Sequence, residues 1–200
     1  LSRFLTPSHT SSHLPERVGH PRPLEGVVRK GEGAQAHLEE VVGGGVSPFS
    51  DRPLAPGDAV YGFAMDPTKM AVRWLHGSFA EYVAAPLDEL ARKPEALSHT
   101  EAAATPLCGC TALQAYKQHG LRSGQRVLVI GASGGVGHLA VQIARHLGAH
   151  VTGVCSSRNA AFVENECGAH TVLAYDEGDV FDAITRDAAA NGPYDIVIDA

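Results

Sequence analysis

The chain has 200 residues and a net charge of −6, and hydrophobic residues make up 44% of it. This composition is typical of a globular protein of one or two domains, and the acidic balance argues against a nucleic acid or an anionic membrane held by bulk charge. No apolar run approaches the roughly 20 residues that a helix needs to span a bilayer, so we expect neither nucleic acid nor membrane as a partner.

The first 19 residues are predicted to form a disordered tail. Residues 1–15 contain no acidic residue, one Arg and many Ser, Thr and Pro residues, which is typical of disorder. The remnant of a transit peptide is the alternative and would place the protein in mitochondria. At the other end, residues 194–200 stop directly after a strand-like run, so we expect the chain to be a fragment of a longer protein.

Residues 20–105 are predicted to form a mainly β domain. Eight of the 12 prolines lie in this region, together with short valine runs and a Gly-Asp turn at residues 56–62. Short strands joined by turns have this texture, and we expect strands within residues 24–33 and 77–86. Residues 34–53 are predicted to form a loop, because three consecutive glycines and two prolines disfavour a long regular element.

From residue 99 onward, helices and strands alternate. Residues 99–120 are alanine-rich and predict a helix that breaks near Pro106 and ends at Gly120. Continuous apolar runs then alternate with apolar residues at helical spacing, which indicates a parallel sheet covered on both faces. The expected strands are residues 127–130, 151–154, 171–174 and 196–198, and the expected helices are residues 136–147, 160–167 and 180–188.

A glycine-rich turn, GASGGVG at residues 131–137, lies between the first of these strands and the next helix. Such a turn brings backbone N–H groups and the positive end of the helix dipole close to a phosphate. Gly131 fits the tight turn, and Gly137 fits close packing of the helix on the strand. We therefore expect a dinucleotide here, with a glycine-rich turn that binds nothing as the alternative. The residues expected against the pyrophosphate are Ser133, Gly134 and Gly135.

The end of the second strand distinguishes the two nicotinamide dinucleotides. An acidic residue there binds the ribose 2′-hydroxyl of NAD, but this chain has Cys155, Ser156, Ser157 and Arg158. Hydroxyl groups and a guanidinium suit a 2′-phosphate, which a carboxylate would repel. We therefore predict NADPH as the cofactor. The alternative is that Arg158 is a solvated charge at the start of the next helix.

The four cysteines are Cys108, Cys110, Cys155 and Cys167. Their spacing is neither that of a zinc ribbon nor that of a disulfide scaffold. Reduced thiols in a cytosol-like compartment fit this pattern best, so the predicted location is the cytoplasm.

Taken together, these segments resemble the medium-chain dehydrogenase/reductase superfamily, and in particular its zinc-independent quinone oxidoreductase branch. The resemblance implies an incomplete GroES-like, mainly β domain over residues 20–105. It also implies the first half of a Rossmann doubly wound parallel sheet over residues 106–200, with the cofactor between the two domains. The segments that carry the resemblance are GDAVYG (57–62), GSFAEYV (77–83), EAAATPLCGCTALQAY (101–116), residues 124–159 and YDIVID (194–199).

The resemblance also implies roles for individual residues. Thr111 corresponds to a threonine near the nicotinamide, and a helix cap or a packing residue is an equal alternative for it. Tyr175 corresponds to a tyrosine near the 2′-phosphate. The resemblance assigns the pyrophosphate to Ser133, Gly134, Gly135 and Val136, and the 2′-phosphate to Ser156, Ser157 and Arg158.

No metal is predicted. The zinc-dependent relatives carry an upstream Cys, a Gly-His-Glu motif and a later Cys or Asp ligand. Here no Cys precedes Cys108, Pro21 follows the Gly-His pair that ends at His20, and Leu107 stands at the later position. A catalytic zinc needs three protein ligands, and the sequence supplies no such set.

The predicted function is NADPH-dependent reduction of a small-molecule carbonyl, enone or quinone by hydride transfer without a metal. No catalytic residue is assigned, because Tyr61 and Tyr82 are proton donors by chemistry but fit core or strand positions better. A zinc-type alcohol dehydrogenase relative and a non-catalytic NADPH-binding module stay open as alternatives. The resemblance implies a homodimer for the parent protein, formed through a sheet edge expected beyond residue 200.

Overall fold

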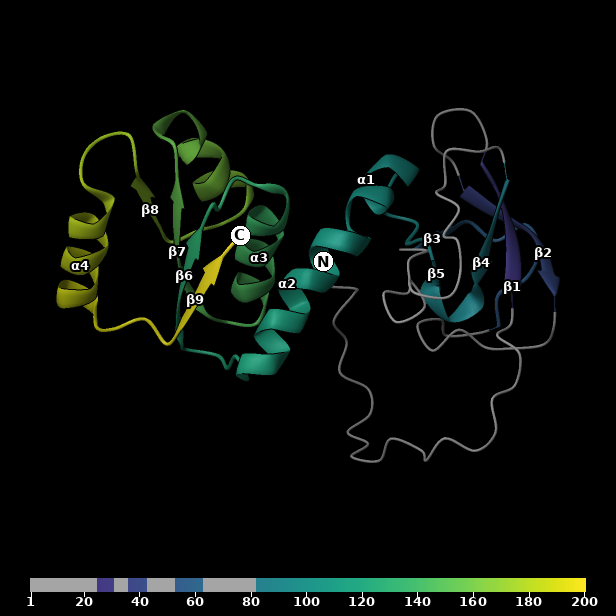
Figure 1. Cartoon of the computed structure of the whole chain (residues 1–200), viewed down its shortest axis with the longest axis horizontal. Coiled ribbons are helices and arrows are strands. Elements are labelled where there is room, and N and C mark those ends of the chain that lie inside the picture. The colour runs from purple at the N-terminus through teal and green to yellow at the C-terminus, as the bar shows by residue number, and fades with distance from the viewer. Residues whose placement is uncertain (1–24, 31–35, 43–52, 63–81) are drawn as a thin grey trace, which may run out of the picture. The chain divides into compact units, whose positions relative to one another are not determined.

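The computed structural model describes residues 25–30, 36–42, 53–62 and 82–200 (Figure 1). The chain divides into two compact units, one within residues 12–107 and one that contains residues 108–200. The predicted tail over residues 1–19 lies outside the described residues, and the predicted domain limits stay predictions. No helix in the described ranges is both long and apolar enough to cross a membrane.

The unit within residues 12–107 contains two small antiparallel sheets in its described part. The predicted strands within residues 24–33 and 77–86 are present as β1 (Glu25–Lys30) and β4 (Tyr82–Pro86). A short 3₁₀ helix, η1 (Leu87–Glu89), follows β4. A small core joins the strands, and the GroES-like character of this region stays a prediction. The first sheet consists of β2 (Ala36–Val42), β1 (Glu25–Lys30) and β4 (Tyr82–Pro86), and the second of β3 (Val60–Gly62) and β5 (Leu90–Arg92), preceded by η1 (Leu87–Glu89). The core residues are Leu54, Val60, Ala85, Leu87 and Leu90.

The loop predicted over residues 34–53 is wrong in its first part, because residues 36–42 form β2. This strand pairs antiparallel with β1, with a register shift between Val27 and Val28. Its sequence, AHLEEVV, does not alternate regularly, so pairing with β1 determines the strand more than local preference does. The Gly-Gly-Gly run that indicated a loop follows the strand at residues 43–45.

The alanine-rich segment forms two helices, α1 (His99–Ala104) and α2 (Pro106–His119). The Ser98 side chain caps α1 by accepting a hydrogen bond from a first-turn N–H group at 3.2 Å. Pro106 opens α2 at a position where its missing N–H group has no helical partner to lose. Gly120 has a φ of 63° and ends α2. The predicted break and stop are therefore confirmed.

The unit that contains residues 108–200 is built on a four-stranded parallel sheet. The strands lie in the spatial order third, second, first, fourth along the chain, as in the first half of a Rossmann sheet. All four predicted strands are confirmed. They are β6 (Arg126–Ile130), β7 (His150–Cys155), β8 (Thr171–Ala174) and β9 (Ile196–Asp199), in the order β8-β7-β6-β9.

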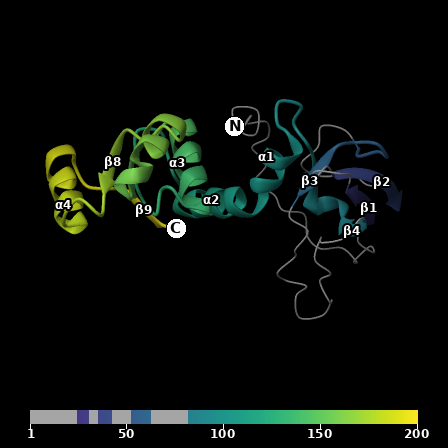
Figure 2. The same ribbon diagram turned by 90° about the horizontal axis from the view of Figure 1, so that it is seen from above.

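Helices cover both faces of this sheet, as predicted. α3 (Gly135–His146) joins β6 to β7, and α4 (Val180–Asn191) joins β8 to β9. Because the two crossovers run in opposite directions across the sheet and crossovers are right-handed, they place their helices on opposite faces. Figures 1 and 2 show the strands between α3 and α4.

The helix predicted over residues 160–167 has a different form. The segment between β7 and β8 consists of a 3₁₀ turn, η2 (Ser157–Asn159), and a π-helical turn, η3 (Phe162–Glu166). The Cys167 N–H group donates to the Phe162 carbonyl at 3.1 Å, across a wider turn than that of an α-helix. Apolar spacing over so short a segment does not distinguish the two kinds of turn.

The core of this unit is aliphatic and draws on the strands, α2, α3 and η3. The buried Tyr116 hydroxyl donates to the Ala140 carbonyl at 3.0 Å. Burial raises the pKa of Tyr116, so the hydroxyl stays protonated. All four cysteines are free thiols. Fully buried members of the core include Tyr116, Val127, Val129, Val141, Val151 and Val163.

Candidate dinucleotide-binding site

The turn after β6 depends on two glycines at positions where a side chain would collide with backbone. Gly131 has a φ of 72°, and a Cβ atom there would lie 2.3 Å from the Ala200 carbonyl oxygen. A Cβ atom on Gly137 would lie 2.1 Å from the Gly131 carbonyl oxygen. The predicted tight turn at Gly131 and close helix packing at Gly137 are therefore confirmed.

Between these glycines, α3 begins without a side-chain cap. Gly134 is the N-cap residue, with φ of −76° and ψ of 175°, and it has no side chain that could accept a hydrogen bond. Its carbonyl accepts the first bond of the helix from the His138 N–H group at 3.0 Å. The N–H groups of residues 135–137 precede that bond, and Gly134 and Gly135 are exposed. This end of α3 therefore presents amide donors and the positive helix dipole to an anion.

The turn lies at the carboxyl end of β6, between β7 and β9, where the direction of the crossovers reverses. In open α/β sheets, ligands bind outside the carboxyl ends of the strands at this point. The Ala132 N–H group donates to the Val154 carbonyl at 2.9 Å, and the Ala200 N–H group donates to the Ile130 carbonyl at 3.1 Å. These bonds fix the turn to both neighbouring strands.

Ser133 connects this turn to the segment that follows β7. Its hydroxyl accepts a hydrogen bond from the Asn159 side-chain amide at 3.1 Å. Asn159 ends η2 and was not among the predicted site residues, because no sequence pattern pairs these two loops. Val136, in the first turn of α3, is half-buried.

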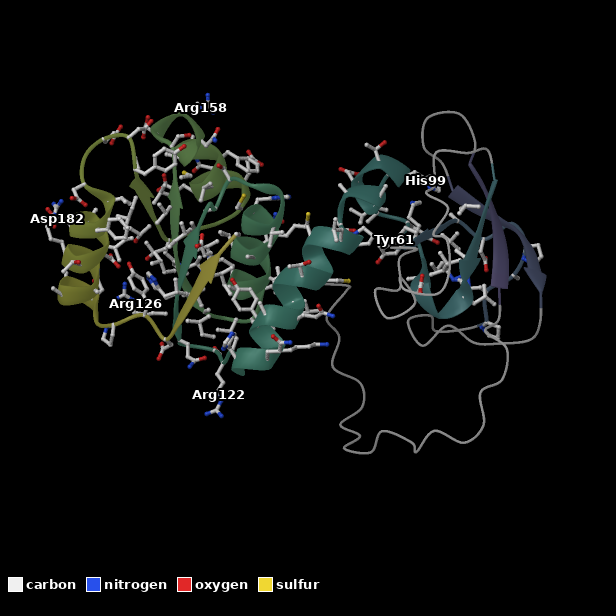
Figure 3. The ribbon with its side chains drawn as sticks, viewed as in Figure 1. Tyr61, His99, Arg122, Arg126, Arg158 and Asp182 are labelled. Carbon is white, nitrogen blue, oxygen red and sulfur yellow. The ribbon has the colours of Figure 1, made fainter. Side chains whose placement is uncertain are left out.

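The predicted 2′-phosphate residues lie together at the next strand ends. Cys155 of β7 pairs with Ala174 of β8, and the Tyr175 N–H group donates to the Cys155 carbonyl at 3.1 Å. Parallel strands end at the same edge of a sheet, so Tyr175 follows β8 beside the segment that follows β7. The Tyr175 side chain is 55% exposed. Arg158 is exposed, and Figure 3 shows its side chain directed away from the unit.

The Ser156 side chain has a buried hydroxyl oxygen without a hydrogen-bond partner in the described part of the chain. The residue is 5% exposed, and its hydroxyl oxygen makes no hydrogen bond to any described residue. Buried hydroxyl groups are rarely left without a partner. Together with the uncapped amides of α3, this hydroxyl fits a phosphorylated dinucleotide.

A carboxylate that the sequence did not place here occupies the same edge. Asp176, two residues after β8, accepts hydrogen bonds from the Ser157 N–H group at 2.8 Å and from the Ser157 hydroxyl at 2.9 Å. The prediction of an absent acid concerned only the residues that directly follow β7. The residues after β7 are not acidic, but the next strand supplies a carboxylate to one of them.

Three further residues were considered from the sequence, Thr111, Tyr61 and Tyr82. Thr111 lies inside α2, away from its ends, and is exposed, so the helix-cap alternative is wrong for it. Tyr61 is half-buried in β3, and Tyr82 begins β4. The strand positions preferred for the two tyrosines are therefore confirmed, and the place of Thr111 near the nicotinamide stays a prediction.

Three comparisons relate the chain to known proteins. Residues 135–200 match the family model described as "Zinc-binding dehydrogenase". The chain is 37% identical over 153 residues, 74% of its length, to "NAD(P)H oxidoreductase RTN4IP1, mitochondrial" of Bos taurus, and spans 36% of that protein. It is similar to the quinone oxidoreductase structure from Coxiella burnetii, at 37% identity and a TM-score of 0.65, over 82% of this chain and 46% of the other.

A further similar structure is that of the quinone oxidoreductase from Thermus thermophilus, which was also solved in complex with NADPH. The identity is 29% and the TM-score 0.60, over 92% of this chain and 60% of the other. The relatives named here are NAD(P)H or quinone oxidoreductases, and the similar structures share the fold of this chain. The chain belongs to the medium-chain dehydrogenase/reductase superfamily and is related to its quinone oxidoreductases.

Proposed function

We propose that the parent protein is an NADPH-dependent oxidoreductase that transfers hydride to a quinone or an α,β-unsaturated carbonyl without a metal. The uncapped N-terminus of α3, at the point where the crossovers reverse, is the observation that carries this proposal. NADPH would supply the hydride. The chain's own residues bind and orient it, with the diphosphate at the amides of Gly135 and Val136 and the 2′-phosphate beside Ser156 and Arg158.

The class of acceptor follows from chemistry and from the relatives. Both similar structures named above are quinone oxidoreductases. A quinone carbonyl or a conjugated C=C bond needs a hydride donor, correct placement and a proton from solvent or a side chain. We assign no residue to that proton. Steady-state oxidation of NADPH by the full-length protein with a panel of quinones and enals tests the acceptor class, and NADPH binding without turnover would favour a non-catalytic module.

A zinc-type dehydrogenase is the second candidate, because the matching family model carries that description. Among the residues that the structure describes, no group of three or more His, Cys, Asp or Glu side chains could hold a metal ion. The described residues therefore do not fit a catalytic zinc, which needs three protein ligands. Metal analysis of the purified full-length protein distinguishes the two candidates. If each chain bound one zinc ion and activity required that ion, the metal-free proposal would be wrong.

Three further proposals concern the parent protein as a whole. A GroES-like fold for residues 20–105 and a homodimer rest on the family alone. The third is the predicted cytoplasmic location. A mitochondrial location is the alternative, and the name of the Bos taurus relative supports it. Microscopy of the tagged full-length protein separates the two locations.

Arg158 offers a direct test of the cofactor. An arginine beside a 2′-phosphate makes charge-assisted hydrogen bonds that a 2′-hydroxyl cannot replace. Arg158→Ala is expected to weaken NADPH binding about tenfold, the effect of about 1.4 kcal/mol, and to leave NADH binding nearly unchanged. Isothermal titration of the purified chain measures both affinities.

Arg122→Ala is the matched control, since Arg122 is also exposed and lies at the opposite end of the same unit (Figure 3). It removes the same charge and is expected to change neither affinity. Equal effects of the two substitutions, or no affinity of the chain for either dinucleotide, would contradict the proposed cofactor site.

A further inference from the structure

Asp176 is bound to the segment where NAD and NADP are distinguished. Both carboxylate oxygens take part, one accepting from the Ser157 N–H group and the other from the Ser157 hydroxyl. Dinucleotide-binding sheets of this kind use an acidic residue at the end of their second strand to bind the ribose 2′-hydroxyl. In this chain the carboxylate lies two residues after β8, and it reaches the same place across the β7–β8 edge.

The Asp176 side chain is a carboxylate at neutral pH. Hydrogen bonding from the Ser157 backbone lowers its pKa, and the Ser157 hydroxyl and the nearby Arg158 charge act in the same direction. Asp176 is exposed, so its charge faces solvent and any ligand at this edge.

The two nicotinamide dinucleotides meet this carboxylate differently. A 2′-phosphate needs hydrogen-bond donors, but both donors of Ser157 already bond to Asp176. The negative charges of the phosphate and of the Asp176 carboxylate also repel each other. A 2′-hydroxyl is itself a donor, and the carboxylate oxygens have further lone pairs that can accept from it. Ser156 and Arg158 oppose this effect, because a buried unpaired hydroxyl and a guanidinium suit the phosphate.

We propose that Asp176 is a specificity-determining residue that limits the preference for NADPH and lets the chain bind NADH as well. The inference rests on the proposed dinucleotide site and refines its cofactor. Asp176 competes with the 2′-phosphate for Ser157, whereas Arg158 attracts that phosphate. The opposing effects of these two charges therefore determine the ratio of the affinities for NADPH and NADH.

The test is Asp176→Asn in the full chain, with Kd values for NADPH and NADH measured by isothermal titration. The amide keeps the shape of the side chain and removes its charge. The ratio of Kd for NADH to Kd for NADPH is expected to rise roughly tenfold, which corresponds to about 1.4 kcal/mol. Most of the change should lie in tighter NADPH binding.

Glu177→Gln is the matched control. Glu177 is the next residue, is exposed and carries the same charge, so this substitution reports the general effect of removing one negative charge. Asp176→Ala, which also frees Ser157, should shift the ratio in the same direction as Asp176→Asn. Melting curves of all three variants check that the fold is unchanged.

The outcomes separate this inference from the proposed function. A ratio that rises in both Asp176 variants and not in Glu177→Gln supports the role of Asp176. Equal shifts in Asp176→Asn and Glu177→Gln, or an unchanged ratio in a chain that binds both dinucleotides, overturn the inference alone. A chain that binds neither dinucleotide overturns the proposed function, and the inference falls with it.

Discussion

At the scale of single residues, Arg126 joins a group of polar contacts in the unit that contains residues 108–200. Its guanidinium donates to the Asp187 carboxylate and to the Gly192 carbonyl, and it lies 4.7 Å from the centre of the Tyr194 ring. The Tyr194 hydroxyl also donates to Asp187. These contacts tie the first residue of β6 to α4 and to the segment before β9, which are distant in the sequence.

Asp187→Asn is expected to lower the free energy of unfolding by about 2 kcal/mol, because it leaves the guanidinium of Arg126 without its counter-charge. The side chains of Arg126 and Asp187 are 13% and 10% exposed. Urea denaturation measures the change. Asp182→Asn, on the exposed side of α4 (Figure 3), is the control and should change stability by no more than about 0.5 kcal/mol.

The effect of Asp187→Asn on stability should depend on pH, because the contact with Arg126 requires the Asp187 carboxylate to be charged. Burial raises the pKa of Asp187, but hydrogen bonds from Tyr194 and Arg126 outweigh it, so the folded pKa lies below the ordinary value of 3.8. A lowered folded pKa contributes stability above the unfolded pKa, and this contribution is lost as pH falls through the folded value. The difference between wild type and Asp187→Asn should therefore be constant near pH 7 and shrink below pH 3.8. A difference that stayed constant down to about pH 2 would contradict the role of the Asp187 charge.

Single residues also show where sequence reasoning ends. The residue types that follow β7 could be read from the chain, and their interpretation as a 2′-phosphate pocket depended on the missing acid. Asp176 and Asn159 could not be found in this way, because each acts across a loop or strand from its partner. Local sequence determines which residue follows a strand, whereas the neighbours of that residue depend on strand order and register.

At the scale of elements, the close approach of α3 to the turn after β6 was predictable. A strand, a glycine cluster and an amphipathic helix in this order have few alternative arrangements. β2 was not predictable, because it is an edge strand without regular alternation that forms through its pairing with β1. The π-helical turn η3 was located but not distinguished from an α-helical one. Apolar periodicity thus identified the four strands of the parallel sheet and the helices α3 and α4, but neither β2 nor the kind of turn in η3.

Gly137→Ala tests the approach of α3 to this turn. The new methyl group would lie 2.1 Å from the Gly131 carbonyl oxygen and 2.9 Å from the Ala132 Cα atom, and neither backbone atom can move alone. We expect a loss of about 3 kcal/mol of stability and at least tenfold weaker dinucleotide binding. Urea denaturation and NADPH titration measure the two effects.

Gly109→Ala is the matched control, since Gly109 also lies inside a helix of this unit. Its nearest neighbour would be a Leu139 methyl carbon at 3.8 Å, an ordinary contact. This substitution should stabilise the protein by about 0.5 kcal/mol, because alanine favours a helix over glycine. If Gly137→Ala were as harmless as Gly109→Ala, the described packing of the turn would be wrong.

At the scale of the whole molecule, the chain is two units with different kinds of sheet. The described part of the unit within residues 12–107 has short antiparallel strands, whereas the unit that contains residues 108–200 has a parallel sheet with a nearly continuous aliphatic core. Every residue proposed to hold the diphosphate and the 2′-phosphate belongs to the second unit. Ligand binding should therefore stabilise that unit in particular.

Hydrogen exchange with mass spectrometry tests this division. A ligand at 100 times its Kd stabilises the state that binds it by about 2.7 kcal/mol, which slows exchange through unfolding of that state roughly a hundredfold. Saturating NADPH should slow exchange in peptides from β6, β7 and β9 and leave peptides from β1 and β4 nearly unchanged. Arg158→Ala at the same NADPH concentration should show less protection in the same peptides. Protection confined to β1 and β4 would place the dinucleotide elsewhere, and equal protection of both sheets would mean that the two units unfold together.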